Sequence, residues 1–353
     1  MRSTSDTGIV ARALRIFGAI ALFFGSAMSP FAGVVHAYSL DGSSPHYAFV
    51  HDPSMIKEGK TYYLFSTGVP GVGGGNLQVR TSTNLVQWTY VGTVFSEIPG
   101  WIIQQVPGVT SLWAPDISYY RGRYQLYYAA STFGSNQSVI GLATNRTLNP
   151  HSKNYRWLDQ GLVIRSSSYD DWNAIDPNFV LGSKGTPWLD FGSFWSGIKM
   201  IRLNPKTRKP SISPARILSL ATRNQPPDAL EAPFIAYRKP YYYLFASYGF
   251  CCRGVNSTYN IRVGRSSKVT GPYYDRAGTA LLSGGGTELL ATEGAMIGPG
   301  GQSVARVGKT YYLVYHYYDA YLNGEARVQI RRLEWSHGWP TVRGSMVAVP
   351  GTP

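Results

Sequence analysis

The segment His51-Asp-Pro-Ser-Met-Ile, followed by Thr61-Tyr-Tyr-Leu-Phe, is the first of five copies of one pattern. The copies recur with a period of very roughly 60 residues, which is typical of repeat architectures. Each copy joins a short strand, a turn and an aromatic strand, as expected for a β-hairpin. The other four copies are Ala114-Pro-Asp-Ile-Ser-Tyr with Arg123-Tyr-Gln-Leu-Tyr-Tyr, Ile175-Asp-Pro-Asn-Phe-Val with Pro187-Trp-Leu-Asp-Phe, Glu231-Ala-Pro-Phe-Ile-Ala with Tyr241-Tyr-Tyr-Leu-Phe, and Gln302-Ser-Val-Ala-Arg with Thr310-Tyr-Tyr-Leu-Val-Tyr.

A further strand motif follows every hairpin, and in several copies a fourth strand with Trp or Tyr comes next, as in Val86-Gln-Trp-Thr-Tyr. Four strands in each of five units predict an all-β fold, a five-bladed β-propeller. The composition agrees, because 26 Tyr, 39 Gly and 22 Pro favour strands and turns over helical bundles. The third-strand motifs are Asn76-Leu-Gln-Val-Arg, Ser138-Val-Ile-Gly-Leu-Ala, Gly197-Ile-Lys-Met-Ile-Arg, Tyr259-Asn-Ile-Arg-Val-Gly and Ala326-Arg-Val-Gln-Ile-Arg.

The first 37 residues have the pattern of a secretory signal peptide. Three arginines precede an apolar stretch from Ile16 to Met28, and Val35-His36-Ala37 resembles a cleavage site. The apolar stretch is shorter than the about 18 to 20 residues that a membrane anchor needs. We therefore expect residues 1–37 to be removed, residues 38–353 to form the propeller catalytic domain, and the mature protein to be secreted, extracellular and free of the membrane.

The formal net charge of +14 predicts affinity for an anionic matrix, either nucleic acid or, for an exported protein, a pectin-like polysaccharide. The basic residues are scattered, and no helix-turn-helix, zinc-finger or ribonucleoprotein signature accompanies them. We therefore expect no nucleic-acid partner, and we expect a monomer.

The two cysteines, Cys251 and Cys252, are adjacent and cannot join distant elements. Export permits a disulfide between them, which would stiffen a loop. Two reduced, half-buried thiols are the alternative. Both interpretations stay open at the level of sequence.

Acidic residues open the first strand of four of the five hairpins. They are Asp52, Asp116, Asp176 and Glu231, whereas the fifth copy has the uncharged Gln302-Ser303. The first strand of each blade lines the channel of a propeller, so we expect these four carboxyl groups to share one register and face one another. Each acid could instead cap its own strand, but clustered like charges cost stability that a functional site tolerates. A protonated and an ionised carboxyl group, with a third to raise the pKa of the acid, are the machinery of glycoside hydrolysis.

Several motifs around these acids resemble glycoside hydrolase family 43, and within it the endo-1,5-α-L-arabinanases. The likeness extends from about Tyr47 to Trp339. The motifs are Val50-His-Asp-Pro-Ser, Trp113-Ala-Pro-Asp, Trp172-Asn-Ala-Ile-Asp-Pro-Asn, Ser193-Phe-Trp-Ser-Gly, Leu230-Glu-Ala-Pro-Phe-Ile and Phe245-Ala-Ser-Tyr-Gly-Phe-Cys-Cys-Arg.

The resemblance implies an inverting hydrolase that cleaves internal α-1,5-L-arabinofuranosidic linkages of arabinan, a pectin side chain, without a cofactor for the chemistry. It implies that Asp52 is the general base, Glu231 the general acid, and Asp176 the residue that orients Glu231 and tunes its pKa. Asp116 would support this cluster. The residues expected to border the bound sugar are Asp52, Trp113, Asp116, Phe133, Gly134, Asn173, Ala174, Ile175, Ser193, Phe194 and Trp195. Trp113, Phe133 and Phe194 are the aromatic rings that we expect to contact it by stacking.

The resemblance also implies a structural metal ion, such as calcium, or a water cluster in the central channel, held through His316 in Leu313-Val-Tyr-His. The chain departs from the family here, since Gly298-Pro-Gly-Gly-Gln-Ser replaces a Gly-His-Asn-Ser type of segment and removes one polar ligand. A histidine satisfied by water and carbonyl groups is the alternative.

Two other functions are compatible with the same scaffold. An exo-acting α-L-arabinofuranosidase or β-xylosidase often carries a β-sandwich after the propeller, and the fifth copy ends close to Pro353. A non-catalytic glycan-binding propeller would lack at least one of the three catalytic-position acids, and all three are present. We therefore expect endo-acting hydrolysis.

Overall fold

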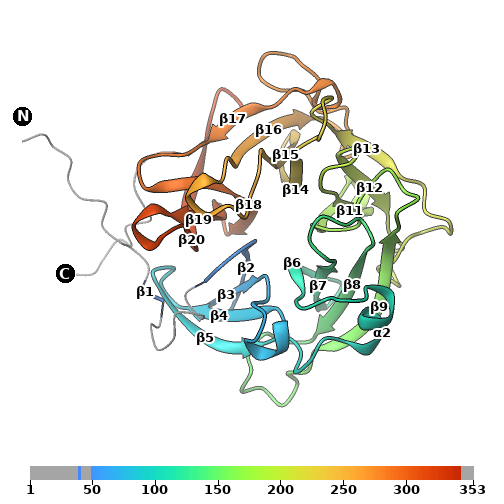
Figure 1. Cartoon of the computed structure of the whole chain (residues 1–353), viewed down its shortest axis with the longest axis vertical. Helices are drawn as coiled ribbons and strands as arrows, with labels where there is room; N and C mark the ends of the chain where they lie inside the picture. The colour runs from blue at the N-terminus through green and yellow to red at the C-terminus, as the bar shows by residue number, and fades with distance from the viewer. Residues whose placement is uncertain (1–38, 41–48, 343–353) are drawn as a thin grey trace, which may run out of the picture. The chain divides into compact units, whose positions relative to one another are not determined.

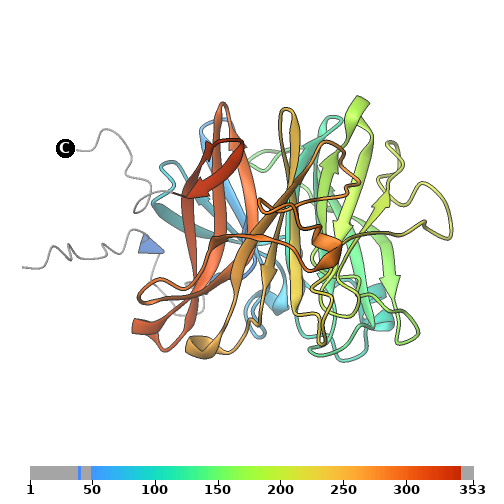
Figure 2. The same ribbon diagram turned by 90° about the horizontal axis from the view of Figure 1, so that it is seen from above.

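The computed structural model describes residues 39–40 and 49–342. Five small sheets are arranged around a central axis, and the strands of each sheet follow one another in sequence order (Figure 1). This arrangement confirms the predicted all-β, five-bladed propeller. Seen from the side, the sheets stand next to one another, and most strands run from one face of the ring toward the other (Figure 2). The predicted signal peptide lies outside the described residues.

Each blade has four antiparallel strands, which start at the channel and end at the rim. In the first blade, the short strand β1 (Ser39–Leu40) also pairs with β5 in parallel. The blades comprise β2 (Ser54–Glu58), β3 (Thr61–Ser66), β4 (Gln78–Ser82) and β5 (Gln87–Thr93); β6 (Trp113–Tyr120), β7 (Arg123–Ala130), β8 (Ser138–Asn145) and β9 (Leu158–Ser166); β10 (Asn178–Leu181), β11 (Pro187–Phe191), β12 (Ile198–Arg202) and β13 (Leu218–Ala221); β14 (Leu230–Arg238), β15 (Tyr241–Tyr248), β16 (Asn260–Ser266) and β17 (Thr287–Leu290); and β18 (Met296–Val307), β19 (Thr310–Asp319), β20 (Glu325–Ser336) and β21 (Trp339–Val342).

The predicted hairpins form as the turn residues require. Between β6 and β7, Arg121 and Gly122 both have positive φ, 48° and 77°, which is the conformation of a two-residue hairpin turn. Among the described residues, the one α-helix is α2 (Gly100–Gln105), which lies in the connection between the first and second blades. Short 3-10 turns occur at η1 (Gly73–Gly75), η2 (Ser183–Gly185), η3 (Gly254–Asn256), η4 (Leu281–Ser283) and η5 (Ala320–Leu322).

The hydrophobic core consists of five clusters, and each cluster fills the space between two neighbouring blades. The last cluster closes the ring, because Val50 and Trp88 of the first blade pack with Val314 and Ile330 of the fifth. The Val50 N–H also donates a hydrogen bond to the Ala326 carbonyl at 3.1 Å. Burial of apolar surface between blades therefore holds the inner strands in place around the channel.

The inner ends of the five blades share one backbone feature. One residue near the inner end of each blade has positive φ. It lies two residues before the first strand in the first and third blades, and within the first strand in the other three. The five residues are Asp52, Ala114, Asp176, Ala232 and Gly301. This pattern corrects the prediction that four acids share one register. Asp52 and Asp176 are equivalent, but Asp116 lies two residues after its blade's position, and Glu231 lies one residue before its own. The four acids therefore occupy three different positions along the inner segments of their blades.

Among the residues that the structure describes, no helix has the length and apolar character needed to span a bilayer.

Candidate active site

Asp52 lies at the junction of the first and fifth blades, with a side chain that is 21% exposed. Its Oδ2 accepts hydrogen bonds from His51 Nδ1 at 2.8 Å and from Thr67 Oγ1 at 2.7 Å. Burial alone would raise the pKa of Asp52, but His51, His316 and these hydrogen bonds together lower it to about 2. Asp52 is therefore an ionised carboxylate at neutral pH.

Glu231, at the start of β14, is almost fully buried. Its Oε2 accepts a hydrogen bond from Ser193 Oγ at 2.6 Å, and its Oε1 accepts another from the Tyr259 hydroxyl. Burial raises the pKa of Glu231, and the charge of Asp52 adds to this effect, although the two hydrogen bonds oppose it. The environment of Glu231 thus favours a protonated carboxyl group, in contrast to that of Asp52.

Asp176 occupies the position in the third blade that Asp52 occupies in the first. Burial, together with the neighbouring Glu231 and Asp52, raises the pKa of Asp176 well above its usual range. Its Oδ2 accepts a hydrogen bond from the Ala232 N–H at 3.0 Å. Two close, buried carboxyl groups resist full ionisation, so Glu231 and Asp176 together favour a state in which one of them is protonated.

Asp116 belongs to a second set of residues, which link neighbouring blades. Its Oδ2 accepts a hydrogen bond from the Phe179 N–H at 2.8 Å, and Asn178 Oδ1 accepts one in turn from the Ile235 N–H at 2.8 Å. In the same way Ser54 accepts one from the Ile117 N–H at 3.1 Å. Burial raises the pKa of Asp116 to about 7. This placement agrees with a supporting position for Asp116.

His316 is fully buried beside Asp52 and stacks against His51, with ring centroids 3.7 Å apart. His316 Nδ1 accepts a hydrogen bond from the Asp52 N–H at 3.1 Å, so the neutral ring carries its proton on Nε2. That Nε2 has no hydrogen-bond partner among the described residues. His51, Asp52 and His316 lie close enough to share an ion. However, an Nε2–H group offers no lone pair to a cation, and calcium prefers oxygen ligands. The arrangement fits water at Nε2 and does not fit calcium.

The predicted aromatic contacts differ in exposure. Phe133 is 83% exposed and Trp195 is 40% exposed, so both rings are accessible to a ligand. Phe194 is half-buried against Phe250, with ring centroids 5.8 Å apart. Trp113 is half-buried, and its indole N–H donates to Ser111 Oγ at 2.8 Å.

Four further predicted contacts are buried. Ala174 is fully buried in the cluster between the second and third blades, so its methyl group is part of the core. Asn173 Oδ1 accepts a hydrogen bond from Ser138 Oγ at 2.7 Å, and Ile175 is buried. Ser193 bonds Glu231, as described above. Gly134, in contrast, is exposed in the loop after β7.

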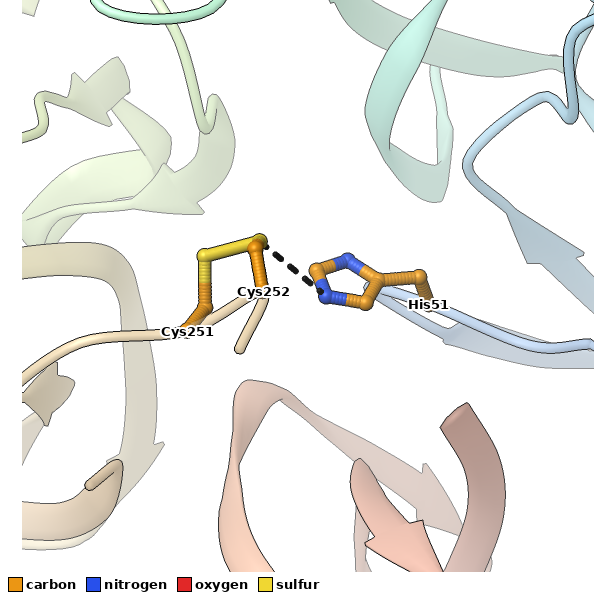
Figure 3. Close-up of side chains that lie close together, drawn as sticks. All are labelled: His51, Cys251 and Cys252. Atoms are coloured by element: carbon orange, nitrogen blue, oxygen red, sulfur yellow. Dashed lines mark hydrogen bonds between the residues drawn. A yellow bond between two sulfur atoms is a disulfide. The ribbon is translucent and has the colours of Figure 1, made fainter. Parts of the chain in front are cut away.

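Sequence reasoning did not identify four groups at this site. Thr67, Tyr259, His51 and Tyr318 all contact an acid or its partner. Thr67 directly follows β3, Tyr259 directly precedes β16, and Tyr318 lies in β19, so these three are far from the acidic motifs in the sequence. His51 had a signal, since it precedes Asp52 in the first motif. Cys251 and Cys252 form a disulfide, which resolves the alternatives left open above, and the disulfide lies next to His51 (Figure 3).

Comparison with known proteins identifies the family. A model of glycosyl hydrolases family 43 matches residues 46–340. The chain belongs to glycosyl hydrolase family 43. It is 45% identical over 293 residues to the extracellular endo-α-(1→5)-L-arabinanase 1 of Bacillus subtilis strain 168, which covers 83% of this chain and 87% of that protein.

Two other known proteins show a similar degree of likeness. The extracellular exo-α-(1→5)-L-arabinofuranosidase ArbA of Cellvibrio japonicus strain Ueda107 is 43% identical over 304 residues, covering 83% of this chain and 86% of that one. A solved structure of Cellvibrio cellulosa α-L-arabinanase complexed with arabinohexaose superposes with a TM-score of 0.79 at 42% identity, covering 84% of this chain and 95% of that chain. This family 43 chain is therefore a glycoside hydrolase.

Proposed function

We propose that the protein hydrolyses internal α-1,5-L-arabinofuranosidic linkages of arabinan with inversion of configuration. The observation that carries the proposal is the opposite electrostatic state of two acids, Asp52 with a lowered pKa and Glu231 with a raised pKa. Inverting hydrolysis needs one ionised and one protonated carboxyl group at the same time.

In the proposed mechanism, Asp52 removes a proton from a water molecule, and the oxygen of that water attacks the anomeric carbon. The bond from this carbon to the leaving sugar oxygen breaks, and the proton of Glu231 passes to that oxygen. We infer that Asp176 orients Glu231 through the Ala232 N–H, and that repulsion between the two carboxyl groups opposes their joint ionisation and keeps the acid protonated. The acids supply both proton transfers, so the chemistry requires no cofactor. Water at His316 Nε2 fills the channel behind Asp52.

The proposed substrate, arabinan of pectin side chains, rests on relatives named arabinanases and on a net charge of +14, which favours an anionic matrix. We further propose that the N-terminal 37 residues direct export, in agreement with two relatives that are named extracellular. Trp113, Phe133 and Phe194 are the rings proposed to stack on the sugar, and Trp195 is proposed to border it. Asp116 acts through the blade contacts described above.

The second candidate is exo action on the same linkage, which the 43% identity to an exo-α-(1→5)-L-arabinofuranosidase favours. The product profile from linear arabinan separates the two. Endo action predicts a ladder of oligosaccharides before monosaccharide accumulates. Release of arabinose alone from the first minutes onward would replace the endo proposal with the exo one.

A further inference from the structure

The candidate base Asp52 is the end of a chain of hydrogen bonds that starts at the disulfide. His51 Nδ1 bonds Asp52 Oδ2 at 2.8 Å, and His51 Nε2 bonds the Tyr318 hydroxyl at 2.9 Å. The same hydroxyl accepts a hydrogen bond from the Cys252 N–H at 2.7 Å. Figure 3 shows the His51 ring directed at the Cys251–Cys252 disulfide, with Cys252 Sγ 3.8 Å from Nε2.

The donors and acceptors of this chain fix its direction. The ionised carboxylate of Asp52 can only accept, so His51 Nδ1 carries the proton of their hydrogen bond. In the neutral ring His51 Nε2 is then an acceptor, and the Tyr318 hydroxyl donates to it at 2.9 Å. The Tyr318 oxygen accepts in turn from the Cys252 N–H, and its contact to Cys252 Sγ is longer, at 3.9 Å. Tyr318 thus stabilises the tautomer of His51 that bonds the candidate base.

The disulfide constrains the first donor of this chain of hydrogen bonds, the Cys252 N–H. A bond between the sulfurs of neighbouring residues closes a small ring that contains the peptide unit between Cys251 and Cys252. The N–H that bonds Tyr318 belongs to that peptide unit. Cys252 also has a positive φ of 65°, an uncommon conformation for a residue with a side chain. Ring closure therefore restricts the orientation of the N–H group at the start of the chain.

We propose that Tyr318 and the Cys251–Cys252 disulfide are positioning residues for the hydrolytic reaction, which hold His51 in the tautomer and orientation that fix the carboxylate of Asp52. This inference rests on the proposed function of Asp52 as the base. It differs from a sugar-binding role for the exposed disulfide, which would act on substrate affinity.

The first test replaces Tyr318 with Phe and uses Tyr317→Phe as the matched control. Tyr317 lies next to Tyr318 on β19. Its hydroxyl contacts Asp319, which is not part of the chain of hydrogen bonds that leads to Asp52. We expect Tyr318→Phe to lower kcat on linear arabinan by roughly 10- to 100-fold with little change in KM, the range typical of outer-shell partners. Tyr317→Phe should keep its kcat. The thermal transition of each variant, measured in parallel, shows whether the protein is folded.

The second test reduces the disulfide in the folded protein with a water-soluble phosphine. The phosphine takes the oxygen of one water molecule, the S–S bond breaks, and the two hydrogens of that water end on the two sulfurs. Reduction should lower kcat of the original protein several-fold, with little further effect on Tyr318→Phe, because both changes act through one chain. The Cys251→Ser and Cys252→Ser double variant should match the reduced protein and be insensitive to phosphine.

The third test reads the His51 tautomer directly by long-range ¹H–¹⁵N correlation at a pH where the ring is neutral. We expect a protonated Nδ1 in the original protein and a mixture of tautomers in Tyr318→Phe. The inference is overturned if Tyr318→Phe keeps the kcat of Tyr317→Phe, or if reduction raises KM alone. Equal losses on reduction with and without Tyr318 would overturn it as well.

An Asp52→Ala variant separates this inference from the proposed function. Full activity of Asp52→Ala would refute the role of Asp52 as base. An inactive Asp52→Ala beside a fully active Tyr318→Phe would leave the base in place and refute only the positioning chain.

Discussion

Asp176 accepts a hydrogen bond at 3.0 Å from the backbone N–H of Ala232, the residue that directly follows Glu231. This contact ties the carboxyl group of the third blade to the chain segment that carries the candidate acid in the fourth. It also keeps two buried carboxyl groups close together, so that ionisation of one disfavours ionisation of the other. We therefore propose that the orientation and the pKa of Glu231 both depend on Asp176.

Replacement of Asp176 by Asn should shift the pH dependence of activity. Asn carries no negative charge, so the ionised form of Glu231 becomes less unfavourable and its pKa falls. The general acid must be protonated, so activity is lost at lower pH and the basic limb of the kcat/KM profile moves toward acid. The acidic limb, which reports Asp52, should move little. An unchanged basic limb with full activity would reduce Asp176 to a structural residue.

Gly301 is the one member of the five equivalent inner-edge positions without a side chain, and its surroundings explain why. A Cβ at this position would collide with Asp52 Oδ1 and with the His316 ring. Gly301→Ala should therefore displace Asp52 and lower kcat at least tenfold.

Gly308→Ala is the matched control for that variant. Gly308 has a similar φ, 61° against 55°, but a Cβ there meets nothing within 4 Å. Gly308→Ala should lower the free energy of unfolding by only about 1 kcal/mol, which is the cost of a positive φ for alanine, and should keep its kcat. Equal effects of the two substitutions on kcat would show that crowding at Asp52 does not matter.

Asp116→Ala should reduce stability more than it reduces chemistry. The substitution leaves the Phe179 N–H without its acceptor in the interior, which typically costs about 1–3 kcal/mol. Denaturant unfolding monitored by Trp fluorescence measures the loss, and exposed Glu97→Ala, expected within about 0.5 kcal/mol of the original protein, is the control. A stable variant with no activity would instead assign Asp116 to the reaction.

The stereochemistry of the first product tests inversion. Hydrolysis of an α-linked arabinofuranoside with one displacement by water releases the β-anomer first, which ¹H NMR detects before mutarotation. Initial appearance of the α-anomer would require a covalent intermediate and a nucleophilic role in place of the basic role of Asp52.

The sequence predicts the propeller because its signal is repeated five times, and strand, turn and strand are local patterns. It also points to Asp52, Asp176 and Glu231, which lie beside these patterns. It does not predict the position of each acid along its inner segment, because this depends on which residue of the motif has positive φ. Thr67 and Tyr259 reach the acids, and Tyr318 reaches His51, from other segments of the chain, and no local pattern indicates such a contact. The disulfide state of Cys251 and Cys252 likewise depends on backbone conformation, which adjacent cysteines alone do not reveal.

The most direct test of the central claim compares Glu231→Ala and Asp52→Ala on arabinan and on an aryl arabino-oligosaccharide whose phenol is strongly acidic. A good leaving group departs without protonation, whereas water needs a base with either substrate. Glu231→Ala should keep far more activity on the aryl substrate than on arabinan, and Asp52→Ala should lose about 10²- to 10⁴-fold or more on both. Equal losses by the two variants on both substrates would contradict the assignment of Glu231 as acid and Asp52 as base.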